Sequence, residues 1–199
     1  MGVALLLALA TPAAAERGYV LIAGGLSFPQ GDDEWTASMD LSPVAAVRGG
    51  LSAPIPEGFV AVELSVEYTP IEEAFTSPAG LSLDLARYRA LAGARLGLDL
   101  ATDVFLTLRL GLGVSHLRID TDYRSSVPFP VEAHDTATDN GFTAEAGVGL
   151  WAQPGATTTM LGVELSLPLG WHPYETSSGM HEELETSERM LTLSLGWRI

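Results

Sequence analysis

Apolar and polar residues alternate one by one through successive segments of this chain, and this alternation constrains the fold more than any other feature. In residues 58–68, valine, leucine and tyrosine fall on one face, while alanine, glutamate and serine fall on the other. Successive side chains of a β-strand point to opposite faces, so a period of two predicts strands. The alternation predicts eight strands, at residues 18–28, 40–51, 58–68, 85–98, 104–117, 142–150, 161–169 and 191–199.

The connections between these segments alternate in length. Long polar connections fall at residues 29–39, 69–84, 120–140 and 172–188, and short ones fall at residues 52–57, 99–103 and 153–157. An even number of strands joined in this way predicts an antiparallel up-and-down barrel with all long loops at one rim. Pro43 has no N–H to donate, so we expect the second strand to be least regular around it.

Alternation alone leaves open which face points outward, because a soluble lipocalin-type barrel would bury its apolar set. The polar face consists mainly of Gly, Ser, Thr and Ala, and every basic residue of the chain is Arg, whereas a soluble surface is richer in Lys and Glu. The apolar face carries no charge through the middle of the six clearest segments. We therefore expect the apolar face to meet lipid, the short turns to be periplasmic and the long loops to lie outside.

The charges on the polar face are balanced, which predicts ion pairs inside a narrow lumen. An unpaired charge in a poorly hydrated interior costs several kcal/mol, and Arg offers a fixed fork of donors for carboxylates. The predicted lumen charge network consists of Arg48, Glu63, Glu67, Arg89, Arg95, Arg109, Glu145 and Glu164. Such a lumen leaves no wide pore.

The first residues form an apolar run that ends in Ala13-Ala14-Ala15, as a secretory signal peptide does before its cleavage site. We expect a signal peptide over residues 1–15 and a barrel domain over residues 16–199, although the run carries no basic residue before its apolar part. Aromatic residues near strand ends predict girdles at the two membrane interfaces. Those expected at the outer rim are Phe28, Tyr68, Phe142 and Trp171; those expected at the periplasmic rim are Tyr19, Phe59, Phe105, Trp151 and Trp197.

In these features, residues 18–199 resemble the OmpA/OmpX-type family of small outer-membrane barrels. The resemblance implies an eight-stranded barrel in the outer membrane, in contact with lipid and lipopolysaccharide, with a structural or surface-presenting role. It also implies that barrel assembly machinery reads the last strand, in which Leu193, Leu195 and Trp197 alternate. The family's last strand normally ends in an aromatic residue, whereas this chain ends in Ile199.

Other functions have weaker support in the sequence. The net charge of −15 argues against nucleic acid as a partner, and without Cys there is no thiol chemistry. An enzyme that modifies lipid A would need a nucleophile beside a base, but Ser115 and His116 are adjacent in a strand and face opposite sides. Ser125, Ser126, His134 and Asp135 follow no catalytic order. We therefore expect no enzymatic activity and no cofactor.

A binding or transport barrel is the alternative function, either for a small hydrophobic ligand or for divalent cations. The long loops are acidic, and carboxylate oxygens suit Ca²⁺ or Mg²⁺, although a solvated repulsive surface explains the same residues. The histidines lack a tight ligand spacing, and we expect all of them to be solvated at the outer rim: His116, His134, His172 and His181. The acidic positions are Asp32, Asp33, Glu34, Asp40, Glu72, Glu73, Asp84, Asp120, Asp122, Glu132, Asp135, Asp139, Glu175, Glu182, Glu183, Glu185 and Glu188.

Overall fold

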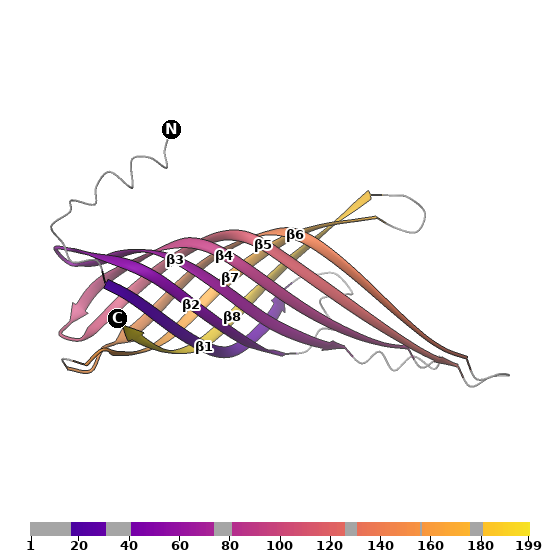
Figure 1. The fold of residues 1–199 in the computed structure, drawn as a ribbon, viewed down its shortest axis with the longest axis horizontal. Coiled ribbons are helices and arrows are strands. Elements are labelled where there is room, and N and C mark those ends of the chain that lie inside the picture. Colours follow the sequence, from indigo (N-terminus) through magenta and orange to yellow (C-terminus); the bar gives the residue numbers. More distant parts are fainter. Residues whose placement is uncertain (1–16, 31–40, 74–80, 126–130, 156, 176–180) are drawn as a thin grey trace.

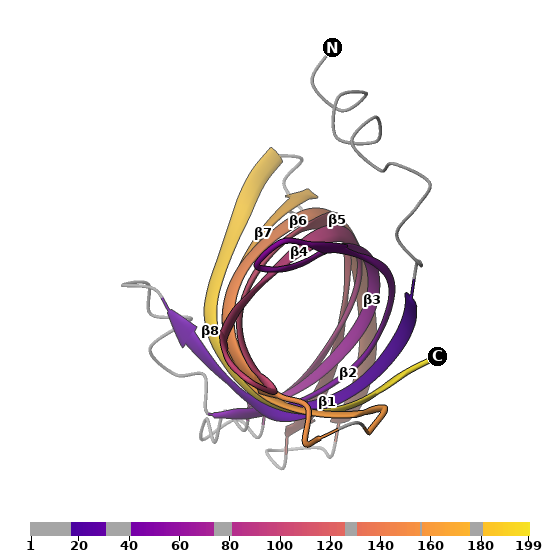
Figure 2. The same ribbon diagram turned by 90° about the vertical axis from the view of Figure 1, so that its left-hand side faces the viewer.

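The chain folds into a single closed antiparallel barrel. The computed structural model describes residues 17–30, 41–73, 81–125, 131–155, 157–175 and 181–199, so the predicted signal peptide lies outside the described residues. Each strand pairs with its neighbours in sequence, and the last pairs with the first (Figures 1 and 2). The strands are β1 (Arg17–Gln30), β2 (Ser42–Ile55), β3 (Gly58–Glu73), β4 (Leu81–Ala101), β5 (Val104–Ser125), β6 (Val131–Ala152), β7 (Thr159–Glu175) and β8 (His181–Arg198). In the described part of the chain, no helix has the length and hydropathy to cross a bilayer.

The two faces of the barrel wall are sorted as the alternation predicts. Most of the large aliphatic side chains point outward, and Leu64 and Leu110 are 69% and 66% exposed. Polar and charged side chains point inward, and Arg48 and Glu164 have no exposed surface. The arrangement of a soluble barrel, with its aliphatic residues inside, is therefore excluded.

A row of outward aromatic side chains marks one end of the aliphatic wall, toward the long loops. This aromatic row consists of Phe28, Tyr68, Tyr88, Phe142 and Trp171. Tyr68 and Tyr88 lie 5.0 Å apart between ring centroids, and Phe142 and Trp171 lie 5.7 Å apart. From the short turns to this row the strands measure 11 residues in β3 and β6 and 13 in β7. A tilted strand needs about 9–11 residues to cross a hydrocarbon core, so each is long enough. We call this portion of each strand its membrane-spanning part.

Several strands continue well beyond the aromatic row, so three predicted loops are shorter than the sequence suggested. The described residues of the segments 69–84, 120–140 and 172–188 are in strands. Pairing extends to Glu73 and Leu83 in the first segment, to Ser125 and Val131 in the second, and to Glu175 and His181 in the third. Beyond the membrane neither face meets lipid, and the alternation of polar and apolar residues fades there while backbone pairing persists. Figure 1 shows these extensions on the side away from the short turns.

Two smaller differences lie in β2. The predicted link 52–57 shrinks, because β2 continues to Ile55 and β3 begins at Gly58. Pro43 remains in the strand, paired with Leu26. It follows Ser42, the first residue of β2, where the loss of one backbone donor disturbs the ladder least.

An arginine on the aliphatic wall should destabilise the barrel according to its depth. Leu110 lies about midway along the membrane-spanning part of β5, and Leu110→Arg should cost about 2–4 kcal/mol of unfolding free energy. Leu100, also exposed, lies by the short turn between β4 and β5, and the control Leu100→Arg should cost about 0–1 kcal/mol. Reversible urea unfolding in phospholipid bilayers measures both. Equal losses at the two positions would contradict this placement of the membrane.

Candidate functional site in the lumen

The charged residues predicted for the lumen all lie inside the barrel, close to one another. Inward parity on six different strands brings them to the middle of the membrane-spanning part, and none is more than 4% exposed. The structure therefore assembles one lumen charge network from Arg48, Glu63, Glu67, Arg89, Arg95, Arg109, Glu145 and Glu164.

Arg109 on β5 is the hub of this network. Its Nε donates to Glu63 Oε1 at 2.7 Å, and its Nη1 donates to Glu145 Oε1. Its Nη2 donates to the hydroxyl of Ser65 at 2.8 Å. One guanidinium thus joins carboxylates on β3 and β6, which flank β4 and β5 in the wall.

Arg48 and Arg95 share the carboxylate of Glu164, which reaches in from β7. Arg48 Nη1 lies 2.6 Å from Glu164 Oε1, and Arg95 Nη1 lies 2.7 Å from Glu164 Oε2. Arg48 also binds Glu67 at 3.2 Å, and Arg95 Nε binds Glu63 at 3.0 Å. Because these bonds cross the bore from β2 to β7, the network closes the lumen as well as neutralising it.

Arg89 completes the network toward the outer end. Its Nη2 lies 2.7 Å from Glu67 Oε2 and 2.7 Å from the thioether sulfur of Met190. Four arginines and four glutamates of the predicted set therefore each have an oppositely charged partner.

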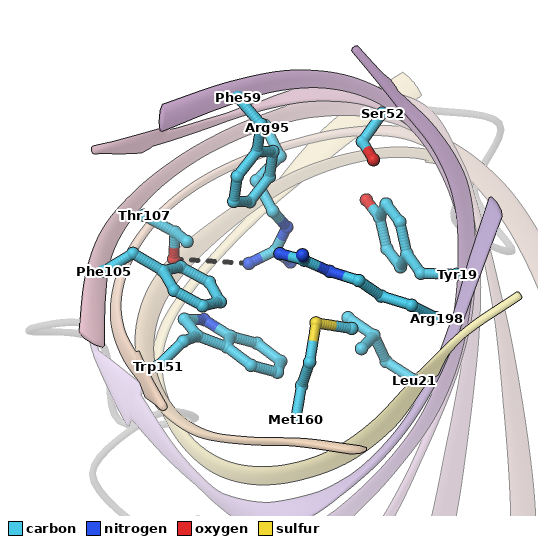
Figure 3. A pocket seen from close by; sticks show the side chains of 10 residues that line it. All are labelled: Tyr19, Leu21, Ser52, Phe59, Arg95, Phe105, Thr107, Trp151, Met160 and Arg198. Carbon is cyan, nitrogen blue, oxygen red and sulfur yellow. Dashed lines mark hydrogen bonds between the residues drawn. The ribbon is translucent and has the colours of Figure 1, made fainter. Parts of the chain in front are cut away.

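Of the five aromatic residues predicted for the periplasmic girdle, Trp197 points outward, and the other four lie on the inner side of the wall. Tyr19, Phe105 and Trp151 are buried in the lumen, and Phe59 packs against them. We call this cluster the aromatic plug; Figure 3 shows the four rings pointing into the interior together with Leu21 and Met160. The plug lies next to the short turns, because β1, β3 and β5 begin there and β6 ends there.

The aromatic plug is tied to the charge network above it. The hydroxyl of Tyr19 donates to Glu63 Oε2 at 2.8 Å, and the Arg95 guanidinium lies 5.3 Å from the centroid of the Trp151 ring. The rings of Phe59 and Phe105 meet edge to face at 5.5 Å. The alternation of side chains along the strand could have predicted the plug. Trp151 follows the outward-facing Leu150, so it must point inward.

Glycines opposite the rings provide the space that the plug occupies. A Cβ atom at Gly97 would overlap the ring of Phe59, and one at Gly162 would overlap the ring of Trp151. Each of these two rings therefore requires the glycine that faces it. The two partners lie far apart in the sequence, so the sequence alone does not reveal the pairing.

A second ion pair lies at the outer end of the lumen, and the sequence reasoning missed it. Arg87 Nη1 binds Glu188 Oε1, and Ser27 donates to Glu188 Oε2 at 2.6 Å. Glu188 was assigned to a solvated acidic loop, but β8 already includes it and turns it inward, so it is only 6% exposed. Its inward direction could have been predicted from the alternation, because Glu188 lies on the same face of β8 as the inward-facing Met190, Thr192 and Ser194.

The prediction of solvated histidines is wrong for His172. Its side chain is buried, and Nδ1 lies 3.2 Å from Asp139 Oδ2. His172 follows Trp171 and so lies beyond the membrane-spanning part; burial lowers the pKa of its ring, and the charge of Asp139 opposes that shift. The side chains of His134 and His181 lie outside the described residues.

The remaining candidates for chemistry stay apart. Ser115 points into the lumen, whereas His116 lies on the outer side of β5, where its Nδ1 is 2.9 Å from Asn140 Oδ1 and its ring lies 6.3 Å from that of Tyr88. Among the residues that the structure describes, no group of three His, Asp or Glu side chains is arranged to hold a metal ion.

A closed barrel with an aliphatic outer wall, an outward aromatic row and a charged, filled lumen defines an integral outer-membrane protein. The chain belongs to the family with the outer membrane protein beta-barrel domain, whose family model matches residues 1–198. No curated protein matches it in sequence. It is thus an outer-membrane barrel of the small type, without a wide pore.

Solved structures of similar fold are also outer-membrane proteins. Neisserial surface protein A superposes with a TM-score of 0.56 at 11% identity, covering 92% of this chain and 97% of that protein. A major outer membrane protein from Thermus thermophilus gives 0.55 at 13% identity, with coverage of 92% and 99%. Ail, the attachment invasion locus protein of Yersinia pestis, gives 0.51 at 14% identity, with coverage of 92% and 98%. At these identities the similarity extends to the fold alone.

Proposed function

We propose that this protein is a non-enzymatic barrel that presents the outer part of its sheet at the cell surface. The lumen charge network and the aromatic plug fill the interior of the membrane-spanning part, which favours a structural role over transport of a solute. Ser115 and His116 lie on opposite sides of the wall, which argues against a hydrolase centre there. The alternative of a barrel that binds a small hydrophobic ligand has less support, because charged side chains cross the lumen.

The observation that carries this proposal is an open strand edge beyond the membrane. Pairing between β6 and β7 ends at Phe142 and Trp171, although β6 extends outward to Val131 and β7 extends outward to Glu175. On its other side, β6 remains paired with β5 along its whole length. Within the part of the chain that the structure describes, residues 131–141 of β6 therefore have no strand partner on the β7 side and form an open edge. The β5–β6 and β7–β8 hairpins diverge in Figure 1.

Specific contacts mark the point where the two hairpins part. A Cβ atom at Gly141 would overlap the backbone carbonyl of Trp171, so only glycine permits this approach. Two residues further outward on β6, Oδ2 of Asp139 lies 3.2 Å from Nδ1 of His172 on β7. An exposed edge of this kind offers backbone N–H and C=O groups to an extended segment of a partner protein. We infer that the surface partner is a protein that adds a strand to β6.

A shortened variant tests this function. Replacing residues 119–137 by an Asn-Gly turn would join Arg118 to Thr138, which are paired across β5 and β6, and would remove most of the edge. Peptides selected from a random library on the intact protein in nanodiscs should bind it, should protect amides of residues 131–141 from hydrogen exchange, and should not bind the shortened form. Peptides that bind both forms equally would count against the proposal.

The expected surroundings follow from the outer wall. We propose that outer-membrane lipid and lipopolysaccharide contact the aliphatic wall and the aromatic row, and that assembly machinery reads the alternating residues of β8. Calcium or magnesium at the acidic outer residues remains a prediction. Asp120, one of these residues, binds Arg118 and Thr136, which fits a solvated polar surface.

A further inference from the structure

Several buried hydrogen-bond donors on β4 and β5, at the outer end of the lumen, have no partner among the described residues. They are Nε and Nη2 of Arg87, Nε of Arg89 and the hydroxyl of Ser115. The three side chains are at most 4% exposed. Arg89 and Ser115 face each other directly across β4 and β5, and Arg87 is the next inward residue of β4. Since buried donors in folded proteins are almost always bonded, this cluster points to an acceptor from outside the chain.

Of the carboxylates around these donors, Glu188, Glu67 and Asp139 are each bound to another group, whereas Glu145 binds Arg109 through Oε1 and keeps an unpartnered Oε2. Glu188 binds Nη1 of Arg87 and the hydroxyl of Ser27. Glu67 binds Nη2 of Arg89 and Nη2 of Arg48, and Asp139 binds His172. The unpartnered groups that remain on β4 and β5 at this level are therefore donors.

The free edge of Arg87 has the shape that an oxyanion requires. Nε and Nη2 lie side by side on the guanidinium, so they can bind two oxygens of one anion, while Nη1 keeps Glu188 in place. A carboxylate would use only that edge, whereas a phosphate has further oxygens for Arg89 Nε and the Ser115 hydroxyl.

His172 adds an acceptor beside these donors. Its Nδ1–H donates to Asp139, which leaves Nε2 as an acceptor, and this buried atom has no partner among the described residues. The residue lies close enough to feel the charge of Arg87. A hydrogen phosphate ion, which carries both acceptor oxygens and a hydroxyl proton, suits such a mixed set of groups.

We propose that Arg87, Arg89 and Ser115 form a phosphate-binding site at the outer end of the lumen, with His172 at its border. This site is separate from the open edge of β6, and it gives the barrel a ligand that the surface-presenting role does not require. The phosphate belongs either to a soluble ion or to a lipid headgroup, since both offer the same oxygens.

Nuclear magnetic resonance of the arginine Nε–H groups tests the site in the intact protein. The protein in phosphatidylcholine nanodiscs is titrated with inorganic phosphate at pH 7, and sodium chloride holds the ionic strength constant. We expect saturable shifts of the Arg87 and Arg89 signals and none at Arg118, whose side chain is 51% exposed outside the lumen. An equal shift at Arg118 overturns the proposal, as does the absence of a saturable shift both with inorganic phosphate and with lipopolysaccharide.

A matched pair of variants tests the role of the hydroxyl. Ser115→Ala removes a donor that has no partner in the protein, so the barrel should keep its stability while the phosphate affinity falls roughly tenfold. Ser194→Ala removes another buried, unpartnered hydroxyl, on β8, and should leave the phosphate affinity unchanged. Equal affinities in both variants and the wild type would overturn the assignment.

A third measurement distinguishes the two sources of phosphate. Nanodiscs that contain lipopolysaccharide are compared, in phosphate-free buffer, with nanodiscs of phosphatidylcholine alone, so that the added phosphates are those of lipopolysaccharide. Shifts of Arg87 and Arg89 under that condition identify a lipid phosphate, whereas shifts that require inorganic phosphate identify a soluble ion. No shift under either condition overturns the site.

Discussion

Replacing Arg109 by alanine should lower the unfolding free energy of the barrel by about 3–5 kcal/mol, the cost of leaving buried charges without their partner. The guanidinium binds Glu63, Glu145 and Ser65 at once. Its loss leaves Glu145 without its bonded partner and leaves Glu63 with only Arg95 and Tyr19, in an interior with little water. Reversible urea unfolding in bilayers measures the difference. The control Arg118→Ala, on an exposed ion pair, should cost at most about 1 kcal/mol.

Adding Glu145→Gln to Arg109→Ala should restore part of that loss, because the second change removes one of the stranded charges. A double-mutant cycle gives the coupling between the two side chains directly. A loss below about 1 kcal/mol for Arg109→Ala, with no coupling, would mean that water screens the network and that the lumen is wetter than its burial indicates.

Replacing Trp151 by alanine should cost about 3–5 kcal/mol, since it leaves a cavity where a large buried ring was packed. The indole lies against Phe105 and under the Arg95 guanidinium, and Gly162 faces it from β7. The matched control is Trp197→Ala at the same end of the barrel, where the indole points outward and is 39% exposed. Unfolding in bilayers should show a much smaller loss for the control.

Equal losses for the two tryptophans would contradict the aromatic plug and favour the girdle that the sequence suggested. A Gly162→Val variant gives an independent check from the opposite wall. Its side chain would collide with the ring of Trp151, so it should also destabilise the barrel, whereas a girdle residue would be indifferent to it.

Strand parity explains why most of the architecture could be predicted. A shift of one residue would turn a whole strand inside out, so the phase of Leu106, Leu108 and Leu110 determines that Arg109 points inward. The charge network then follows from composition, because similar numbers of Arg and Glu on one face have nowhere else to be neutralised. Which Arg meets which Glu could not be predicted, because that depends on the stagger between strands distant in sequence.

The failures of prediction share a physical cause, which is that hydrophobicity reports on the environment rather than on backbone pairing. Beyond the aromatic row the alternation fades, so the sequence predicts a loop at Glu188 although β8 continues through it. The sequence predicts an interfacial position for Trp151 because aromatic rings are common at membrane surfaces. Because Trp151 directly follows the outward-facing Leu150 in β6, its side chain must point inward. At strand ends, the position in the alternation is therefore a better guide to side-chain direction than residue type.

The division of the lumen charges along the chain has a consequence for biogenesis. Strands β1–β4 carry the larger share of the inward arginines, while β5–β8 carry the larger share of the inward glutamates, and Arg48 and Glu164 are 116 positions apart in sequence. The lumen-facing charges of each half therefore do not cancel within that half. A half-inserted or truncated chain would hold excess charge of one sign against hydrocarbon, so insertion is penalised until both halves have met. The charged residues that fill the finished barrel therefore favour insertion of the complete set of strands over insertion of a part of it.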